Sequence, residues 1–364
     1  MKIIVAIDSF KGSLNSMEAA RAVENGIKKA GKNVELKIYP LADGGEGTCK
    51  ILTKYLNGEF KLVRVAGALG TRLDTTYGKV GDTAIIESAS AAGLEIVPKN
   101  LRNPIRTTTL GVGEMIVNAL DEGCKNFIIG LGGTATNDCG LGMLTALGFK
   151  FNTGIFGRDL MRVKKIELTD KFSDCKFKIA CDVNNPLTGE NGCSVVYGSQ
   201  KGADEATIQK MDGWIKDFAA LTAETLQIEN ISVPGDGAAG GLGFAFRTFL
   251  KGELVPGVNL VLETMKIADE LKDADILITG EGMIDSQTSQ GKAPMGVAKL
   301  AKSINAKIKV VAIGGGVKDI SAISEIDAAF SILREPTDLI TAMQKSTTEK
   351  NLSVTAEQII RLIA

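Results

Sequence analysis

Acidic side chains and a lysine share one glycine-bearing loop in the segment ADILITGEGMIDSQTSQGKAPMGVA, residues 274–298. Glu281 and Asp285 could bind a divalent metal through their carboxylate oxygens, and Lys292 could neutralise a phosphate. The apolar residues at the start of the segment predict a buried strand that ends at Gly280. The proline two residues after Lys292 predicts the start of a helix, whose free N–H groups favour an anion. A solvated connection whose glycines only form turns is the alternative.

Three further apolar runs, each predicted to be a strand, end in loops of similar composition. They cover residues 2–7, 35–39 and 127–131. The polar and glycine residues that follow them are Asp8, Ser9 and Lys11; Asp43; and Gly132, Gly133, Thr134 and Asn137. Open α/β sheets bind ligands at the edge where the carboxyl ends of parallel strands meet. The recurrence of such loops predicts a phosphorylated ligand held together with a divalent metal.

The densest glycine segment is GDGAAGGLG, residues 235–243, which includes Gly237, Gly240 and Gly241. A backbone without Cβ atoms can approach a phosphate closely, and it can also form a tight crossover between domains. The segment is not a Walker A loop, because Gly241 stands where that motif requires lysine. The glycine–lysine pair at Lys292 fails as well, because alanine follows it in place of serine or threonine. Both roles of the glycines stay open at this point.

Composition excludes several classes of protein. The 364 residues carry 42 Lys and Arg against 43 Asp and Glu, a net charge of −1, so no basic face for nucleic acid is expected. No apolar run reaches the ~18 residues of a membrane helix and no cleavable signal is recognisable, which predicts a cytoplasmic protein without a membrane partner. The 6 cysteines form no CxxC pair, so reduced thiols are expected. Histidine is absent, which leaves acid–base chemistry to Asp, Glu, Lys, Tyr or Cys.

The order of the predicted elements indicates an α/β fold with two domains, since a chain of this length exceeds what one core usually supports. Short β-rich pieces follow one another from residue 61 to about residue 93 with no helix between them, which predicts a mixed or antiparallel sheet. We predict a parallel Rossmann-like sheet domain built from both chain ends, residues 1–65 and 262–364. A second mixed-sheet α/β domain, residues 66–261, is inserted between them. The active site is expected in the interdomain cleft.

Six colinear segments resemble the signature segments of the bacterial glycerate kinase family and extend over essentially the whole chain. They are DSFKGSL from Asp8, PLADGGEGT from Pro40, GGTATNDCGLGML from Gly132, ACDVNNPL from Ala180, PGDGAAGGLG from Pro234 and ITGEGMIDSQTSQGK from Ile278. The resemblance implies a two-domain α/β enzyme of the glycerate 2-kinase type that uses ATP and Mg²⁺. It implies phosphorylation of D-glycerate to 2-phosphoglycerate, with 3-phosphoglycerate as the less favoured product.

The reaction sets the roles that the residues are expected to fill. The carboxylate of the hydroxy acid needs a cation, Lys11 or Arg106, and its hydroxyl needs a base, Asp8 or Asp43. Asp8, Lys11, Asp43 and Lys292 form the predicted catalytic set. The remaining predicted contacts are Arg106, Ser9 and Asn137 to the substrate; Gly132, Gly133, Thr134, Gly237, Gly240 and Gly241 to nucleotide phosphate; and Glu281 and Asp285 to the metal.

Two other classes of protein fit parts of the pattern. A dinucleotide oxidoreductase is compatible with a parallel sheet and with the GGG at residues 314–316, and a non-catalytic sensor is compatible with small-ligand binding. ATP turnover that depends on glycerate would distinguish the kinase from both. The identity of the phosphorylated hydroxyl stays open, and a homodimer is compatible with the sequence.

Overall fold

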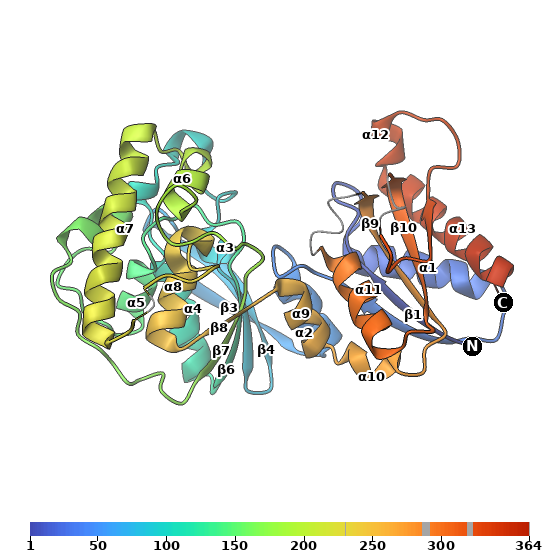
Figure 1. Ribbon diagram of the computed structural model, residues 1–364, viewed down its shortest axis with the longest axis horizontal. Coiled ribbons are helices and arrows are strands. Elements are labelled where there is room, and N and C mark those ends of the chain that lie inside the picture. Colours follow the sequence, from blue (N-terminus) through green and yellow to red (C-terminus); the bar gives the residue numbers. More distant parts are fainter. Residues whose placement is uncertain (230, 286–291, 319–322, 364) are drawn as a thin grey trace. The chain divides into compact units, whose positions relative to one another are not determined.

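A parallel five-stranded sheet and a mixed six-stranded sheet organise this protein (Figure 1). The structure is a computed structural model and describes residues 1–229, 231–285, 292–318 and 323–363. The chain divides into unit 1, formed by Met1–Asp43 with Val258–Ala364, and unit 2, Gly44–Gly257. The predicted α/β class is therefore confirmed, with a parallel-sheet unit that contains both chain ends and a mixed-sheet unit that contains the middle of the chain.

The boundaries of the units differ from those predicted at 65/66 and 261/262. Residues 44–65 belong to unit 2 because β3 (Glu59–Ala66) pairs with β4 (Arg72–Val80) along its whole length. The second boundary falls at Gly257, where helix α9 begins. The β-rich pieces from residue 61 onward predicted the mixed sheet, but the predicted boundary at 65/66 falls inside β3 and divides it from its partner strand β4.

Unit 1 is a fully parallel sheet with the strand order β11-β10-β9-β1-β2. Its strands are β1 (Lys2–Ile7), β2 (Glu35–Pro40), β9 (Ile276–Ile284), β10 (Lys309–Val317) and β11 (Ala328–Ser331), and its helices are α1 (Ser16–Lys29), α9 (Gly257–Thr264), α10 (Ile267–Leu271), α11 (Ala293–Ile304), α12 (Leu339–Ala342) and α13 (Lys345–Ile363). The first strand of the chain thus lies beside β9, a strand from the last third of the chain.

Local sequence explains how unit 1 closes around its first strand. β1 is buried from Ile3 to Ile7, as expected for a strand covered on both faces. α1 begins with a capping box, in which Asn15 Oδ1 accepts a hydrogen bond from Glu18 N at 3.0 Å and the Glu18 carboxylate accepts one from Asn15 N at 3.1 Å. α1 packs against α13 (Figure 1). Gly26 permits this approach, because a Cβ there would lie 2.0 Å from the carbonyl oxygen of Ser353.

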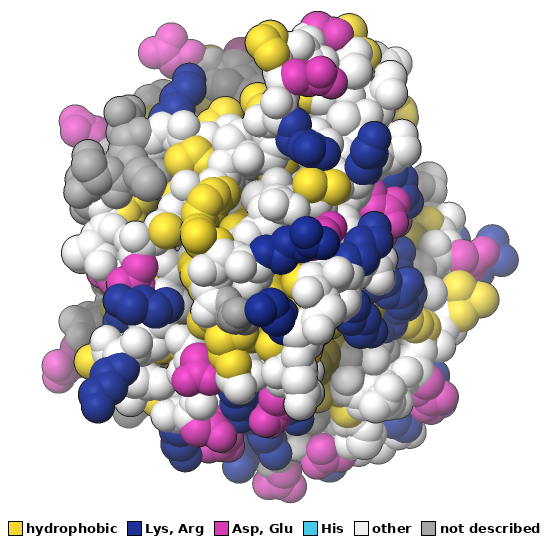
Figure 2. All heavy atoms as spheres, turned by 90° about the vertical axis from the view of Figure 1, so that its right-hand side faces the viewer, with side chains coloured by type: hydrophobic (Ala, Val, Ile, Leu, Met, Phe, Trp, Pro, Cys, Tyr) yellow, Lys and Arg dark blue, Asp and Glu magenta, His cyan; other side chains and the backbone are white. Residues whose placement is uncertain are grey.

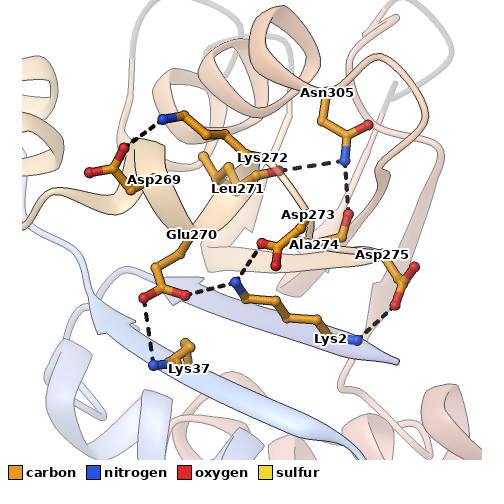
Figure 3. A network of polar contacts seen from close by, with 10 residues as sticks. All are labelled: Lys2, Lys37, Asp269, Glu270, Leu271, Lys272, Asp273, Ala274, Asp275 and Asn305. Carbon is orange, nitrogen blue, oxygen red and sulfur yellow. Dashed lines mark hydrogen bonds and ion pairs between the residues drawn. The ribbon is translucent and has the colours of Figure 1, made fainter.

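An ionic network ties the amino end of β1 to the segment that precedes β9 (Figure 3). Lys2 Nζ lies 2.8 Å from a carboxylate oxygen of Glu270 and 2.5 Å from one of Asp273. The backbone N–H of Lys2 donates to Asp275 at 2.7 Å. Asn305 donates to the carbonyl of Ala274 at 3.0 Å. These contacts hold the neighbouring strands in register at the end of the sheet opposite to their carboxyl ends.

Unit 2 contains a sheet with the strand order β3-β4-β5-β6-β7-β8. The pairs β3–β4 and β4–β5 are antiparallel, and the three pairs from β5 to β8 are parallel, so the predicted mixed sheet is confirmed. Its remaining elements are α2 (Thr48–Tyr55), β5 (Thr83–Glu87), α3 (Ala89–Ala92), η1 (Lys99–Leu101), η2 (Pro104–Arg106), α4 (Leu110–Asp121), β6 (Asn126–Gly130), α5 (Leu141–Ala146), η3 (Gly157–Arg162), β7 (Lys176–Ala180), α6 (Cys193–Tyr197), η4 (Ser199–Lys201), α7 (Glu205–Leu226), α8 (Ala238–Leu250) and β8 (Glu253–Val255).

One predicted strand of unit 1 differs from the observed one. The strand expected to end at Gly280 continues to Ile284, because β10 is equally long and pairs with it through Gly314 to Val317. Glu281 therefore lies on a strand rather than in a loop. In the same unit, α9 and α10 are separated at Lys266, which has the left-handed φ of 54°.

Lys and Arg side chains gather on the face of unit 1 that Figure 2 shows, with acidic and apolar side chains among them. Among the lysines of unit 1, Lys28 pairs with Glu24 and Lys345 pairs with Glu18. No helix in the part of the chain that the structure describes is long and apolar enough to cross a membrane.

Candidate active site

The four predicted catalytic residues line one pocket of unit 1, with a volume of about 420 Å³. Asp8 and Lys11 follow β1, Asp43 follows β2, and Lys292 precedes α11. β1 pairs with β2 on one side and with β9 on the other, so the carboxyl ends of these strands meet at one edge. The pocket is lined by Asp8, Ser9, Phe10, Lys11, Ser13, Asp43, Glu281, Gly282, Met283, Lys292, Ala293, Gly315, Gly316, Ile332, Leu333, Leu339, Ala342, Met343 and Thr348.

Asp8 is the group whose acidity the pocket changes most clearly. Burial raises the pKa of its carboxyl group from 3.8 to about 6, and the neighbouring carboxylates of Asp43 and Glu281 act in the same direction. The ammonium of Lys11 and a 2.6 Å hydrogen bond from Ser9 N to Asp8 Oδ1 oppose this rise. Asp8 is therefore ionised at neutral pH but holds a proton far more strongly than an exposed aspartate.

Lys292 and Glu281 both line the pocket and form an ion pair. The ammonium lies 3.7 Å from the carboxylate, and the Lys292 side chain is 42% exposed against 12% for Glu281. Lys292 occupies the N-cap position of α11 without capping the helix through its side chain, and Pro294 follows in the first turn. The ammonium thus stays available beside a helix end that attracts anions.

The two predicted metal ligands occupy different environments. Glu281 lines the pocket with Asp8 and Asp43, whereas Asp285 is not among the lining residues and lies after the end of β9. In the described parts of the chain, no group of three or more His, Cys, Asp or Glu is arranged to enclose a metal. Mg²⁺ usually keeps several waters and binds through one or two carboxylates plus phosphate, so the carboxylates of this pocket do not need to enclose the ion. Burial is the main cause of the raised pKa of Asp8, and repulsion from Asp43 and Glu281 adds to it; a cation would relieve that repulsion.

The loop after β6 in unit 2 carries a row of backbone donors. Gly133 has a left-handed φ of 77°, and both Gly132 and Gly133 are exposed. Among the described residues, the N–H groups of Gly132, Gly133 and Thr134 donate no hydrogen bond. The Thr134 hydroxyl is buried and also lacks a partner there. Consecutive N–H groups around a left-handed residue form the concave donor set that binds anions.

The carbonyls of the same loop point to protein partners. Gly133 O accepts from Leu94 N at 2.7 Å, and Ala135 O accepts from the Thr107 hydroxyl at 3.1 Å. Asp138 anchors the far end, since one carboxylate oxygen accepts from both the N–H and the hydroxyl of Thr109 at 2.8 Å. These bonds fix the carbonyls of Gly133 and Ala135 on protein groups, whereas the N–H groups of Gly132, Gly133 and Thr134 donate to none of the described residues.

The other predicted glycines are buried, and they contact protein backbone. A Cβ on Gly240 would lie 2.2 Å from the carbonyl oxygen of Thr136, and a Cβ on Gly237 would lie 2.3 Å from that of Pro186. Gly241, with φ of 90°, packs against Cys139. Of the two roles that the sequence left open for these glycines, the structure shows close packing of backbone against backbone, with the 132–138 loop as one partner.

Two predicted substrate contacts belong to unit 2, whereas the residues that line the pocket belong to unit 1. Arg106 is exposed at the end of η2. Asn137 is fully buried, and its amide donates to the Ser194 hydroxyl at 2.8 Å. The position of Asn137 shows that it supports the loop from inside the unit.

The sequence of this chain is similar to those of known proteins along almost its whole length. A model of the glycerate kinase family matches residues 3–364. The chain belongs to the glycerate kinase family. It is similar to the glycerate kinase of Halalkalibacterium halodurans, with 45% identity over 94% of this chain and 93% of the relative. It is similar to the glycerate 2-kinase of Escherichia coli K12, with 40% identity over 92% of this chain and 91% of the relative.

A solved structure agrees with the glycerate kinase family assignment. It is a crystal structure of a Salmonella typhimurium LT2 protein titled as a glycerate kinase 2, with a TM-score of 0.90 and 39% identity over 100% of this chain and 98% of that one. Membership of the glycerate kinase family makes this protein a kinase enzyme and excludes the oxidoreductase and sensor alternatives as its principal activity.

The sequence did not predict some of the residues that line the pocket of unit 1. Leu333, Leu339 and Met343 line it with apolar surface, and Gly315 and Gly316 line it at the end of β10. The GGG at the end of a predicted strand was a usable signal for the glycines. The apolar residues carried no signal, because neither their types nor their spacing differs from those of ordinary helix and loop positions.

Proposed function

We propose that this chain transfers the γ-phosphoryl group of ATP to the 2-hydroxyl of D-glycerate, forming 2-phosphoglycerate and ADP in the cytoplasm. The observation that carries the proposal is the pocket of unit 1, where three carboxylates and two lysines line one cavity. Phosphoryl transfer requires little covalent help from the protein, but it requires positioning and charge stabilisation. Family membership and the name of the E. coli relative support glycerate as the acceptor and position 2 as the site of transfer.

Asp8 is the proposed base for the acceptor hydroxyl. A catalytic base works best when its pKa lies near the working pH, and the raised pKa of Asp8 brings it closer to neutrality than an ordinary aspartate. Asp43 lies in the same pocket and orients the hydroxyl or replaces Asp8 in this role. Lys11 is the proposed partner of the glycerate carboxylate, with Ser9 beside it.

Lys292 is proposed to neutralise charge on the transferring phosphoryl group. Its ammonium is half-exposed in the pocket and lies beside the N-terminus of α11. The exposed N–H groups of Gly132 and Gly133, with Thr134, are proposed to bind the remaining phosphates of ATP. Glu281 would hold Mg²⁺, which supplies positive charge to the phosphate oxygens when it is bound.

The proposal is tested by the products of the reaction. The protein is incubated with ATP, Mg²⁺ and D-glycerate, and ADP formation and the phosphorus NMR spectrum are recorded. A phosphate ester on carbon 2 couples to one proton and gives a doublet, whereas an ester on carbon 3 couples to two protons and gives a triplet. ADP formation that requires glycerate, with a doublet, is expected. A triplet would refute the position, and ADP formation independent of glycerate would refute the acceptor.

A further inference from the structure

Lys201 is a buried lysine in unit 2 that the proposed reaction does not use. It ends η4, its residue is 3% exposed, and its ammonium donates to the carbonyl oxygen of Thr136 at 2.7 Å. Burial lowers the pKa of this lysine to about 8. A buried ammonium costs free energy unless its surroundings compensate for the lost water. A methionine of similar length would fill the same space without that cost, so the charge and its donors need an explanation.

No carboxylate forms an ion pair with Lys201 among the residues that the structure describes. The negative charge of Asp138 favours the charged form of Lys201 and acts to raise its pKa. The carboxylate oxygens of Asp138, however, accept hydrogen bonds from Thr109, Gly140 and Gly142. The bonded partner of Lys201 is instead a backbone carbonyl. A lysine used in this way fixes the position of a loop.

The carbonyl that Lys201 binds belongs to the 132–138 loop, in which the N–H groups of Gly132, Gly133 and Thr134 donate to no described residue. The carbonyls at 133 and 135 are held by Leu94 and Thr107, and the carbonyl at 136 is held by Lys201. The Thr136 hydroxyl and the Asn137 amide oxygen are buried acceptors without a partner in the described part of the chain. The loop therefore has an excess of buried acceptors, which a buried cation offsets.

We propose that Lys201 is a positioning residue: by binding the Thr136 carbonyl, it holds the 132–136 backbone in the conformation that presents the Gly132 and Gly133 N–H groups to a nucleotide phosphate. This inference rests on the proposed phosphate role of that loop. Gly202 supports the geometry, because its φ of 93° and its close approach to the Arg102 carbonyl fix the turn directly after Lys201.

The kinetic test compares Lys201→Met, which keeps the apolar stem and removes the donors, with Lys201→Gln, which keeps a shorter donor. Lys201→Met is expected to lower kcat/KM for ATP about tenfold or more, which corresponds to one unsatisfied buried carbonyl. The KM for glycerate is expected to change less than twofold, and Lys201→Gln is expected to recover part of the loss. Lys210→Met, an exposed position on α7, is the matched control. Unchanged ATP kinetics in Lys201→Met would overturn the inference.

Amide hydrogen exchange of residues 131–138, measured with and without ATP in the absence of glycerate, separates the two proposals. In the parent protein ATP should slow exchange in this segment, and in Lys201→Met the segment should exchange faster and gain less protection. If ATP protects nothing here in the parent protein, the phosphate role of the loop is wrong. If ATP protects the parent and Lys201→Met equally, the phosphate role stands and the positioning role is wrong. Should Lys201→Met not fold, Lys201→Gln undergoes the same measurement.

Discussion

Asp8 links the stability of the fold to the proposed catalysis. Its pKa is raised from 3.8 to about 6 in the folded protein, so the folded state binds more protons than the unfolded state between these two pH values. Stability from this group is therefore fully present below pH 3.8 and is lost as the pH rises through about 6. The ionised form that a base requires is the form that destabilises the fold.

We predict that Asp8→Asn raises the free energy of unfolding at pH 7.5 by about 1 to 2 kcal/mol, a value reduced for partial solvent screening. The same variant should lose about 10²-fold or more in kcat. In the parent enzyme, kcat/KM should fall as the pH drops through about 6. Denaturant unfolding and a pH–rate profile measure these effects, with the exposed Asp217→Asn on α7 as control. A parent profile that stays flat from pH 5 to pH 8 would remove Asp8 from the role of base.

Lys292 is predicted to act on the transition state more than on bound substrate. Removing a donor or charge that stabilises a developing charge typically costs about 2.7 to 4 kcal/mol, or ~10² to 10³ in rate. Lys292→Ala should lower kcat by that factor and change the KM for glycerate and the melting temperature far less, because the Lys292 side chain is 42% exposed and its ammonium lies 3.7 Å from the Glu281 carboxylate. Lys299→Ala, exposed on α11, should behave like the parent. Near-parental turnover of Lys292→Ala would show that the segment is only a connection.

At the scale of elements, the 132–138 loop and the start of α8 depend on each other. Ala239, Gly240 and Gly241 have left-handed backbone angles where α8 begins, and the chain there packs on the loop. Gly241 closes on Cys139 in the same way. The glycine-rich segment therefore supports the backbone of the 132–138 loop, and its Gly240 and Gly241 are buried.

Gly240→Ala is predicted to destabilise unit 2 by about 2 kcal/mol or more, because alanine would need φ of 69° and would place its Cβ 2.2 Å from the Thr136 carbonyl. Gly213→Ala on α7 is the opposite case, since nothing lies within 4 Å of its Cβ position. There alanine should stabilise by roughly 0.5–1 kcal/mol. Thermal or denaturant unfolding of the two variants tests the pair, and a neutral Gly240→Ala would contradict the packing argument.

At the scale of the whole molecule, the net charge is only −1, yet three carboxylates line one pocket. Three carboxylates gather where an anionic nucleotide and an anionic acid are proposed to react. We predict that turnover requires a divalent cation, because these carboxylates would otherwise repel ATP. Excess chelator should abolish ADP formation, and added Mg²⁺ should restore it. Full turnover in excess chelator would contradict this, whereas Glu281→Gln should raise the Mg²⁺ concentration required for half-maximal rate.

The sequence by itself determined the family, the α/β class and the segments that carry the pocket. Asp8, Asp43, Glu281 and Lys292 follow or end predicted parallel strands, and such strands place their carboxyl ends at a common edge. Two of these strands, β1 and β9, are neighbours although more than half the chain separates them. Local patterns sufficed here because apolar runs, glycines and charged exits are all short-range features.

Only the tertiary structure decided which polar groups are exposed and which are buried. Asn137 and Lys201 have ordinary surface chemistry in the sequence, yet both are buried because elements distant in the chain cover them. Glu281 lies on a strand because β10 extends far enough to pair with it. Gly132 is open to solvent whereas Gly240 is closed against backbone. Burial and pairing depend on neighbours in space, and no window of sequence contains those neighbours.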